Sequence, residues 1–160
     1  MDYVWNPWRW AYISGKERKQ GCVFCDLPKE NKDDEHFILH RARLSYIILN
    51  IFPYTSGHLM IVPFEHQSSL AELPDDTTNE MMSLAKVSQR ALAEEYKPDG
   101  FNIGMNLGAA AGAGIAQHVH LHAVPRWIGD GNFMSVIGET RMLPESLENT
   151  LQRLKPYFQA

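Results

Sequence analysis

The spacing of apolar and polar positions along the chain predicts several strands grouped around one long helix. Segments 36–40, 45–50, 58–62, 101–107 and 118–124 are short and rich in β-branched and aromatic residues, which is typical of strands. Turn-forming residues such as Pro53 and Gly57 separate neighbouring segments. The pattern predicts an α+β domain with a mainly antiparallel, five-stranded sheet.

Two further segments have helical periodicity. From Asp75 or Asp76, either of which is a candidate N-cap, to about Tyr96, apolar residues recur every three or four positions. The members of this stripe are Met81, Leu84, Ala85, Ser88, Ala91, Leu92 and Tyr96. Near the C-terminus, Pro144 is expected in the first turn of a second helix that carries Leu147, Leu151 and Leu154 on one face.

Length and composition limit the classes of protein that this chain can represent. With 160 residues, 44% of them hydrophobic, it can bury one core, so residues 21–160 are predicted to form a single domain. Residues 1–20 mix aromatic and charged side chains and are predicted to form an N-terminal arm. No apolar run approaches a membrane span and no secretory signal is visible, so we expect a cytoplasmic protein. The net charge of −4 and the absence of a basic stripe argue against a nucleic acid partner.

The densest chemical signal is the segment in which His118, His120 and His122 alternate with apolar residues. Residues two apart on a strand share a face, so the three imidazoles are expected to line one surface. Such a set fits metal binding, and it also fits nucleophilic and acid–base chemistry at phosphorus. The small-residue loop 108–114 leads into this segment, and glycine allows a backbone to approach an anion closely, which favours phosphate.

The segment 118–124 resembles the signature of the histidine triad family, in which three histidines alternate with apolar residues. The resemblance extends to Asn50 and the segment 56–63, and it covers roughly residues 20–145. Segment 124–127 and the following residues to Arg141 are similar to the branch that contains diadenosine tetraphosphate phosphorylases.

The resemblance implies a fold and a set of residue roles. His120 would be the nucleophile that forms a nucleotidyl-histidine, His122 would donate to the α-phosphate, and His58 would support His122. Asn50 would hold the ribose, and Asn106 with the backbone of Ala113, Gly114 and Ile115 would line the phosphate site. Many relatives carry Gln and Ser or Thr where this chain has Gly114 and Ile115, so only backbone groups are offered there. A neutral imidazole is the reactive form, which agrees with an ordinary histidine pKa of ~6.5.

A second candidate site begins with Cys22 and Cys25, whose spacing is typical of a metal clip or a redox pair. Two ligands do not complete a tetrahedral zinc site. Resemblance to those histidine triad proteins that have this motif implies His66 and His118 as the other two ligands of a structural zinc ion. The alternative is that both cysteines are simply reduced and buried.

The leading hypothesis is therefore an enzyme, a nucleotidyl hydrolase or transferase that cleaves dinucleoside polyphosphates, with inorganic phosphate as a candidate acceptor. Alternatives are a nucleoside phosphoramidate hydrolase, a non-catalytic zinc- or nucleotide-binding module, and a metal enzyme that uses the triad itself as ligands. The resemblance also implies a homodimer. An aromatic surplus that includes Trp5, Trp8, Trp10, Phe133, Tyr157 and Phe158 leaves room for its interface.

Overall fold

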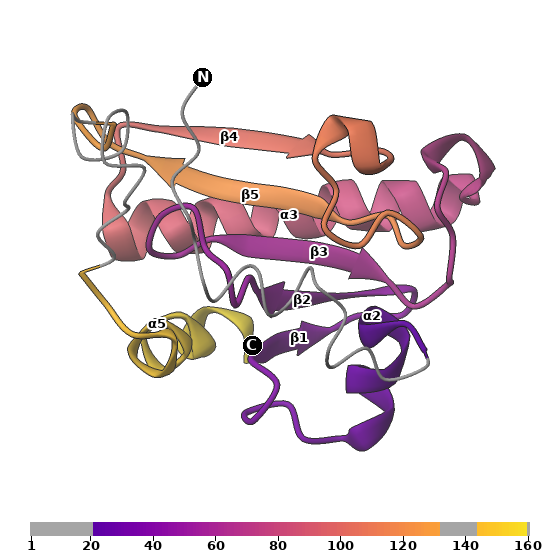
Figure 1. Ribbon diagram of the computed structural model, residues 1–160. Helices are drawn as coiled ribbons and strands as arrows, with labels where there is room; N and C mark the ends of the chain where they lie inside the picture. The colour runs from indigo at the N-terminus through magenta and orange to yellow at the C-terminus, as the bar shows by residue number, and fades with distance from the viewer. Residues whose placement is uncertain (1–20, 132–143, 160) are drawn as a thin grey trace.

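The computed structural model describes residues 21–131 and 144–159. The predicted N-terminal arm, Phe133 and the segment 132–141 of the family resemblance lie outside these residues. Within them the chain forms one sheet with helices on both sides (Figure 1).

The sheet has five strands in the order β1-β2-β3-β5-β4, and every neighbouring pair is antiparallel. The strands are β1 (Ile38–Arg41), β2 (Ser45–Leu49), β3 (Leu59–Pro63), β4 (Gly100–Met105) and β5 (Leu121–Arg126). The sequence-based prediction of an α+β fold with a five-stranded antiparallel sheet is confirmed.

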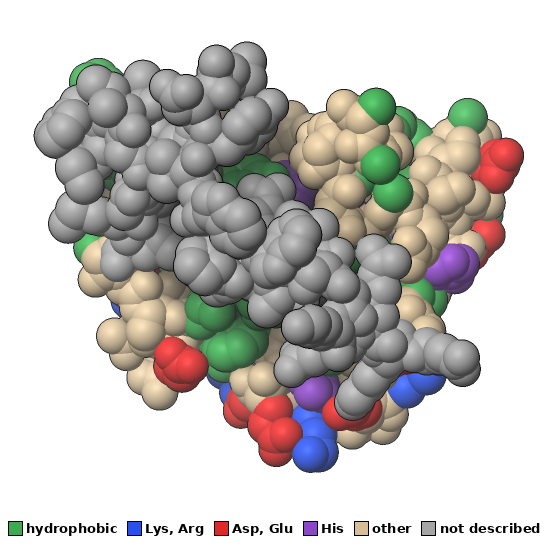
Figure 2. Space-filling view, in the orientation of Figure 1, with side chains coloured by type: hydrophobic (Ala, Val, Ile, Leu, Met, Phe, Trp, Pro, Cys, Tyr) green, Lys and Arg blue, Asp and Glu red, His purple; other side chains and the backbone are tan. Residues whose placement is uncertain are grey.

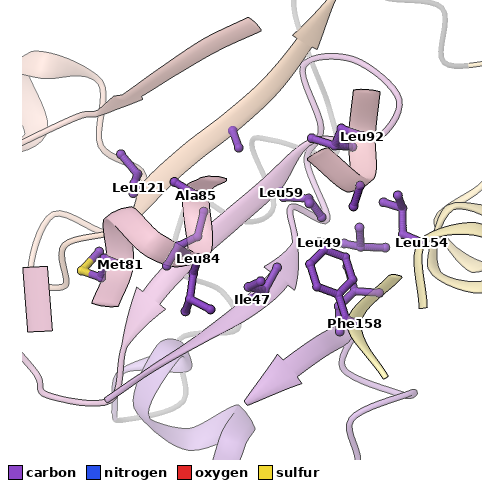
Figure 3. Packing of buried hydrophobic residues seen from close by; sticks show 14 of the residues in the cluster. Ile47, Leu49, Leu59, Met81, Leu84, Ala85, Leu92, Leu121, Leu154 and Phe158 are labelled. Atoms are coloured by element: carbon purple, nitrogen blue, oxygen red, sulfur yellow. The ribbon is translucent and has the colours of Figure 1, made fainter. Parts of the chain in front are cut away.

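One face of the sheet is covered by the two longer helices, α3 (Asp75–Tyr96) and α5 (Leu147–Leu154). Figure 1 shows α3 running along the back of the sheet, and Figure 3 shows side chains of both helices meeting strand residues. The predicted stripe of α3 is buried from Met81 to Leu92, and it packs against Ile47, Leu59 and Leu121. Burial of this stripe is the main reason that the segment is helical, because packing of an amphipathic face supplies most helix stability.

The opposite face of the sheet carries a second apolar cluster. It consists of Phe24, Ile38, Tyr46, Ile48, Met60 and Val62. Phe24 comes from α2 (Val23–Asp26), a four-residue helix followed by the 3-10 turn Leu27–Glu30. Because side chains of β2 and β3 alternate between the two clusters, both faces of the central strands are buried and their sequence is almost continuously apolar.

Strand β5 begins later than predicted. The prediction placed His118 and His120 in the strand, whereas the β3–β5 ladder starts at Leu121 opposite Ile61. Continuing that register would bring Pro63 opposite Val119, and proline has no N–H to donate. The Pro63 carbonyl accepts instead from the imidazole of His118 at 2.9 Å. The alternation is nevertheless kept, because Val119, Leu121 and Ala123 all belong to the cluster under α3.

Pro125 was also expected to stop this strand, but β5 continues to Arg126. Over these last residues β5 pairs only with β4, so the position of Pro125 behaves as an edge, where proline is tolerated.

The helix termini differ in detail from the prediction. Asp75 and Asp76 lie in the first turn of α3 rather than capping it, since Pro74 is the residue before the helix. Helix α5 begins after Ser146, whose Oγ accepts from the N–H of Asn149 at 3.3 Å, so Pro144 lies outside the helix. Within loop 108–114, Ala109–Ala111 form a 3-10 turn between Gly108 (φ 84°) and Gly112 (φ 89°).

The surface adds two observations. No helix among the described residues is long and apolar enough to cross a membrane. On the face drawn in Figure 2, the visible Lys and Arg side chains lie beside Asp and Glu side chains rather than in a patch of one sign.

Of the aromatic residues expected at a subunit interface, Phe158 is buried in the core of its own chain, and Tyr157 packs against that core.

Candidate active site and metal cluster

Three of the predicted site histidines meet where β3 and β5 lie side by side. His58 immediately precedes β3, His120 immediately precedes β5, and His122 lies within β5, opposite Met60. The ring centroids of His58 and His122 are 5.0 Å apart, and those of His120 and His122 are 4.9 Å apart. All three side chains are buried.

A chain of hydrogen bonds determines which nitrogen of His122 carries the proton. The backbone N–H of Tyr54 donates to Nδ1 of His58 at 3.0 Å, so a neutral His58 carries its proton on Nε2. That Nε2 lies 2.9 Å from Nδ1 of His122 and donates to it. A neutral His122 therefore carries its own proton on Nε2, which is buried and has no partner among the described residues. The arrangement presents a preset N–H donor.

The opposite assignment follows for His120. Its Nδ1 lies 2.8 Å from the backbone carbonyl of His118, which can only accept, so Nδ1 carries the proton. The lone pair of a neutral His120 is consequently on Nε2, the atom that can attack an electrophile. The two neighbouring imidazoles thus have complementary roles: Nε2 of His120 can accept a hydrogen bond or act as a nucleophile, and Nε2 of His122 can donate a hydrogen bond.

Burial keeps both rings neutral at physiological pH. It lowers the pKa of His120, an effect that the hydrogen bond to the His118 carbonyl opposes. Burial, with a smaller contribution from the charge of a protonated His120, lowers the pKa of His122 to about 4. Charging either ring would take an ion out of water, and no carboxylate among the described residues is paired with it, so desolvation is the main cause of both shifts.

A cavity of about 860 Å³ opens beside His122 over strands β4 and β5. Its lining includes the predicted phosphate-site residue Asn106, together with Asn102, Gly104 and Arg126. Gly104 pairs with His122 and Asn102 pairs with Val124, so these residues face the cavity from adjacent strands. The volume is in the range of small-molecule sites.

Asn50, the predicted ribose residue, lies next to His58 in a smaller cavity of about 260 Å³. Its Oδ1 accepts from the N–H of Phe52 at 2.9 Å, and its Nδ2 donates to Nδ1 of His58 at 3.3 Å. The side chain is only 9% exposed. In this structure Asn50 therefore also supports the orientation of His58.

The predicted backbone contacts at Ala113, Gly114 and Ile115 lie in the loop that precedes His118. The N–H of Ala113 donates to the carbonyl of Gly108 at 3.3 Å. Ile115 packs against the cluster that contains Phe24. These three residues are not among those that line the cavity beside His122.

The four predicted metal ligands are brought together, from three separate parts of the chain. Cys22 and Cys25 flank Phe24, His66 follows β3, and His118 precedes β5; one donor atom of each lies within 4.8 Å of the others. We call Cys22, Cys25, His66 and His118 the Cys–His cluster. Nδ1 of His118 lies 3.3 Å from Sγ of Cys22 and 3.5 Å from Sγ of Cys25, and Nδ1 of His66 lies 3.3 Å from Sγ of Cys25.

The donor set fits a divalent ion that prefers sulfur and imidazole ligands, above all zinc. Nε2 of His118 donates to the Pro63 carbonyl, which leaves the Nδ1 lone pair directed at the two sulfurs. Burial and the hydrogen bond with Cys22 raise the pKa of Cys25 to about 11, so metal binding here must release protons. His118 alone of the triad belongs to this cluster, which argues against the triad acting together as a set of ligands.

Sequence reasoning missed two aromatic residues at the site. The ring of Tyr54 lies 4.6 Å from that of His58 and 5.8 Å from that of His122, and Tyr54 lines the large cavity. The ring of Phe24 lies 5.1 Å from that of His120. Both residues lie close in sequence to motifs that the sequence analysis did identify: Tyr54 lies four residues before His58, and Phe24 lies between the two cysteines. An aromatic residue so close to each motif was the signal that could have identified them.

Comparison with solved structures finds the same fold in other proteins. A zinc-bound histidine triad family protein from Mycobacterium smegmatis superposes with a TM-score of 0.70 at 30% identity, covering 86% of this chain and 92% of that one. A histidine triad nucleotide-binding protein from Sulfolobus tokodaii superposes with a TM-score of 0.69 at 24% identity, covering 85% and 91%. The second likeness shows the fold alone.

Comparison with curated sequences identifies relatives. A Mycobacterium tuberculosis protein named AP-4-A phosphorylase is 36% identical over 96% of this chain and 83% of its own. A yeast adenosine 5'-monophosphoramidase is 33% identical over 66% of this chain and 62% of its own. The predicted enzyme class, a histidine triad nucleotide hydrolase or nucleotidyltransferase, is confirmed by these matches. Residues 31–127 match the HIT domain model, and the chain belongs to the HIT domain family.

Proposed function

We propose that this chain cleaves dinucleoside polyphosphates of the diadenosine tetraphosphate type, with His120 as the nucleophile. The observation that carries the proposal is the pair of complementary tautomers, a lone pair on Nε2 of His120 beside an N–H donor on His122 that has no partner among the described residues. The likeness to the M. tuberculosis protein, which extends over 96% of this chain, supports the choice of substrate class.

In the first step, Nε2 of His120 attacks the α-phosphorus of one nucleotide. The bond between that phosphorus and its bridging oxygen breaks, and diadenosine tetraphosphate would yield adenylyl-His120 and ATP. The N–H of His122 donates to a non-bridging α-phosphate oxygen as negative charge develops there. A donor that is already oriented needs no reorganisation during the reaction, which is where electrostatic catalysis gains most.

In the second step, an acceptor oxygen attacks the same phosphorus and the P–N bond to His120 breaks. Inorganic phosphate would give ADP, and water would give AMP. Either acceptor regenerates a neutral His120 with its Nδ1 proton still held by the His118 carbonyl.

The nucleotide would lie along the histidine face of the sheet. We propose that Asn50 contacts the ribose, that Asn106, the residue after β4, contacts phosphate, and that backbone groups of Ala113, Gly114 and Ile115 take part in phosphate binding. The positions of Asn106 and His122 in one cavity support the second assignment.

We propose that the Cys–His cluster binds one structural zinc ion. When bound, the ion supplies a cross-link between α2, the segment after β3 and the segment before β5. Metal analysis of protein purified without chelators tests this assignment. One equivalent of zinc is expected, and less than a tenth of an equivalent would contradict it.

We also propose a homodimer in which two sheets join. Strand β4 lies at one edge of the sheet, where its single neighbour among the described strands is β5, and its apolar residue Ile103 is 41% exposed. An exposed edge strand is a template for pairing with a second copy. Sedimentation equilibrium at micromolar concentration tests the assignment, and a monomer there would refute it.

The deciding experiment for the reaction is incubation of the purified protein with diadenosine tetraphosphate, with and without inorganic phosphate, followed by separation of nucleotides. ADP with ATP, formed only with phosphate, identifies a phosphorylase, whereas AMP with ATP, formed without phosphate, identifies a hydrolase. His120→Ala should abolish turnover while the circular dichroism spectrum is unchanged. Full activity of that variant would contradict the assignment of the nucleophile.

The second candidate is hydrolysis of nucleoside phosphoramidates, which the yeast relative's name favours. The same attack by His120 would then expel an amine. Cleavage of adenosine 5'-phosphoramidate without turnover of diadenosine tetraphosphate would select this candidate.

A further inference from the structure

We propose that Phe24 is a positioning residue through which the Cys–His cluster fixes the imidazole of His120. That His120 is the nucleophile rests on the proposed function, but the contact between the two rings does not. The cluster would then influence the reaction as well as the stability of the fold.

The first argument is the place of Phe24 in the chain. It lies in α2, between Cys22, the residue before the helix, and Cys25 within it, so candidate metal ligands lie on both sides of it in the chain. Its side chain is only 4% exposed. Its ring centroid lies 5.5 Å from that of His118, with the rings edge to face, and 5.1 Å from that of His120. A single side chain therefore touches both a ligand of the cluster and the nucleophile.

The second argument is that α2 is a short helix that apolar packing holds against the described part of the domain. The helix has four residues and no side-chain cap at its N-terminus. Apart from the contacts of Phe24 with its apolar cluster, the Phe24 carbonyl accepts from the hydroxyl of Tyr46 at 2.8 Å. An ion shared by Cys22, Cys25, His66 and His118 would tie both ends of α2 to the body of the domain, and would hold the Phe24 ring against His120.

The third argument is that a second connection ends on the same imidazole. The carbonyl of His118 accepts the Nδ1 proton of His120, while the ring of His118 faces the cysteines. The backbone contact fixes which nitrogen is protonated, and the Phe24 ring limits where the imidazole plane can turn. Together they define the direction of the Nε2 lone pair.

The experiment compares Phe24→Leu, His66→Ala and the double variant with the zinc-loaded parent. Leucine retains apolar bulk but loses the ring contact with His120. His66 is the exposed corner of the cluster, so His66→Ala weakens metal binding without removing a contact of Phe24. Phe158→Leu is the matched control, because Phe158 is similarly buried and contacts an imidazole, that of His40, away from the site.

Turnover of diadenosine tetraphosphate gives the first readout. Phe24→Leu is expected to lower kcat by about ten- to a hundredfold, since small displacements of reacting groups have effects of that size, with KM within about twofold. His66→Ala should lower kcat in the same direction, and the double variant should be little slower than Phe24→Leu because both changes act through one contact. Phe158→Leu should keep the parental kcat.

The ring-proton NMR signal of His120, identified by its loss in His120→Gln, gives a readout that needs no substrate. It should move in His66→Ala, which keeps the Phe24 ring, and stay in place in Phe158→Leu. In Phe24→Leu the loss of the ring current at 5.1 Å moves the signal whether or not the imidazole turns, so that variant is read by its kinetics alone. If no nucleotide is turned over, the proposed function fails, and this signal still decides the coupling.

Three results would overturn the inference. A raised KM with unchanged kcat in Phe24→Leu would mean that the ring contacts the nucleotide instead. Effects on kcat that multiply in the double variant would mean that metal and ring act independently. An unmoved His120 signal in His66→Ala would mean that the Cys–His cluster does not position the imidazole.

Discussion

Acidification should lower the free energy of unfolding of this protein by protonating His122, and the substitution His122→Gln should remove that contribution. Burial lowers the pKa of His122 from 6.5 to about 4. The unfolded chain therefore binds a proton between these values that the native chain does not, and stability is lost as the pH falls from about 6.5 towards 4. The hydrogen bond from His58 opposes protonation of His122 further, because Nδ1 of His122 already accepts that hydrogen bond.

The size of the effect follows from the two pKa values. Linkage gives up to about 2 kcal/mol between pH 7 and pH 5 for this one group, approaching about 3 kcal/mol at lower pH. Above pH 7 the contribution of His122 should be flat, since both states are then neutral.

The assay is urea unfolding of the zinc-loaded parent and of His122→Gln at pH 7 and pH 5. Buried His118 and His120 and the metal cluster also respond to acid, but they are common to both proteins, so the difference in slope isolates His122. His122→Gln should lose about 2 kcal/mol less than the parent over this interval. Equal losses in the two proteins would refute the reasoning.

Three other substitutions have definite expected outcomes. His58→Ala removes the donor that fixes the tautomer of His122, so kcat should fall by about ten- to a hundredfold with KM nearly unchanged, and steady-state kinetics with unaltered kcat would contradict this. Arg153→Ala removes a charged hydrogen bond of 2.9 Å to the largely buried Glu145, and the free energy of unfolding in urea should fall by about 1–3 kcal/mol. An unchanged free energy of unfolding would mean that the Glu145 carboxylate is rehydrated at no cost. Leu92→Ala opens a cavity at a fully buried position and should cost about 2–5 kcal/mol in the same assay, with a smaller loss indicating that the core collapses around it.

The parts of the fold that depend on repeating patterns were predictable. The stripe of α3 and the alternation around the histidines are periodic over several residues, and the structure places them as expected. The late start of β5 was not predictable from that segment, because it depends on Pro63, which lies on another strand. Helix α2 has four residues, which is too few to show a period.

The site divides in the same way. Residue types and spacing were enough to select His118, His120, His122, Cys22 and Cys25 as candidates. His58, His66 and the role of His118 as a metal ligand came from the resemblance to the histidine triad family. The tautomers depend on the Tyr54 N–H and the His118 carbonyl, which are backbone groups and leave no trace in residue identity. The contact between Phe24 and His120 joins positions 96 apart in the chain, and only the folded sheet brings them together.

Strand β5 and the residues before it also limit which insertions and deletions this gene can tolerate. Val119, Leu121 and Ala123 fill the core under α3, while the histidines between them face the other side. Removing one residue between Gln117 and Ala123 would exchange the two sets, burying imidazoles under the helix and exposing apolar side chains at the reaction centre. Length changes here should therefore survive selection only in pairs, whereas substitutions that keep the alternation can be sampled one at a time.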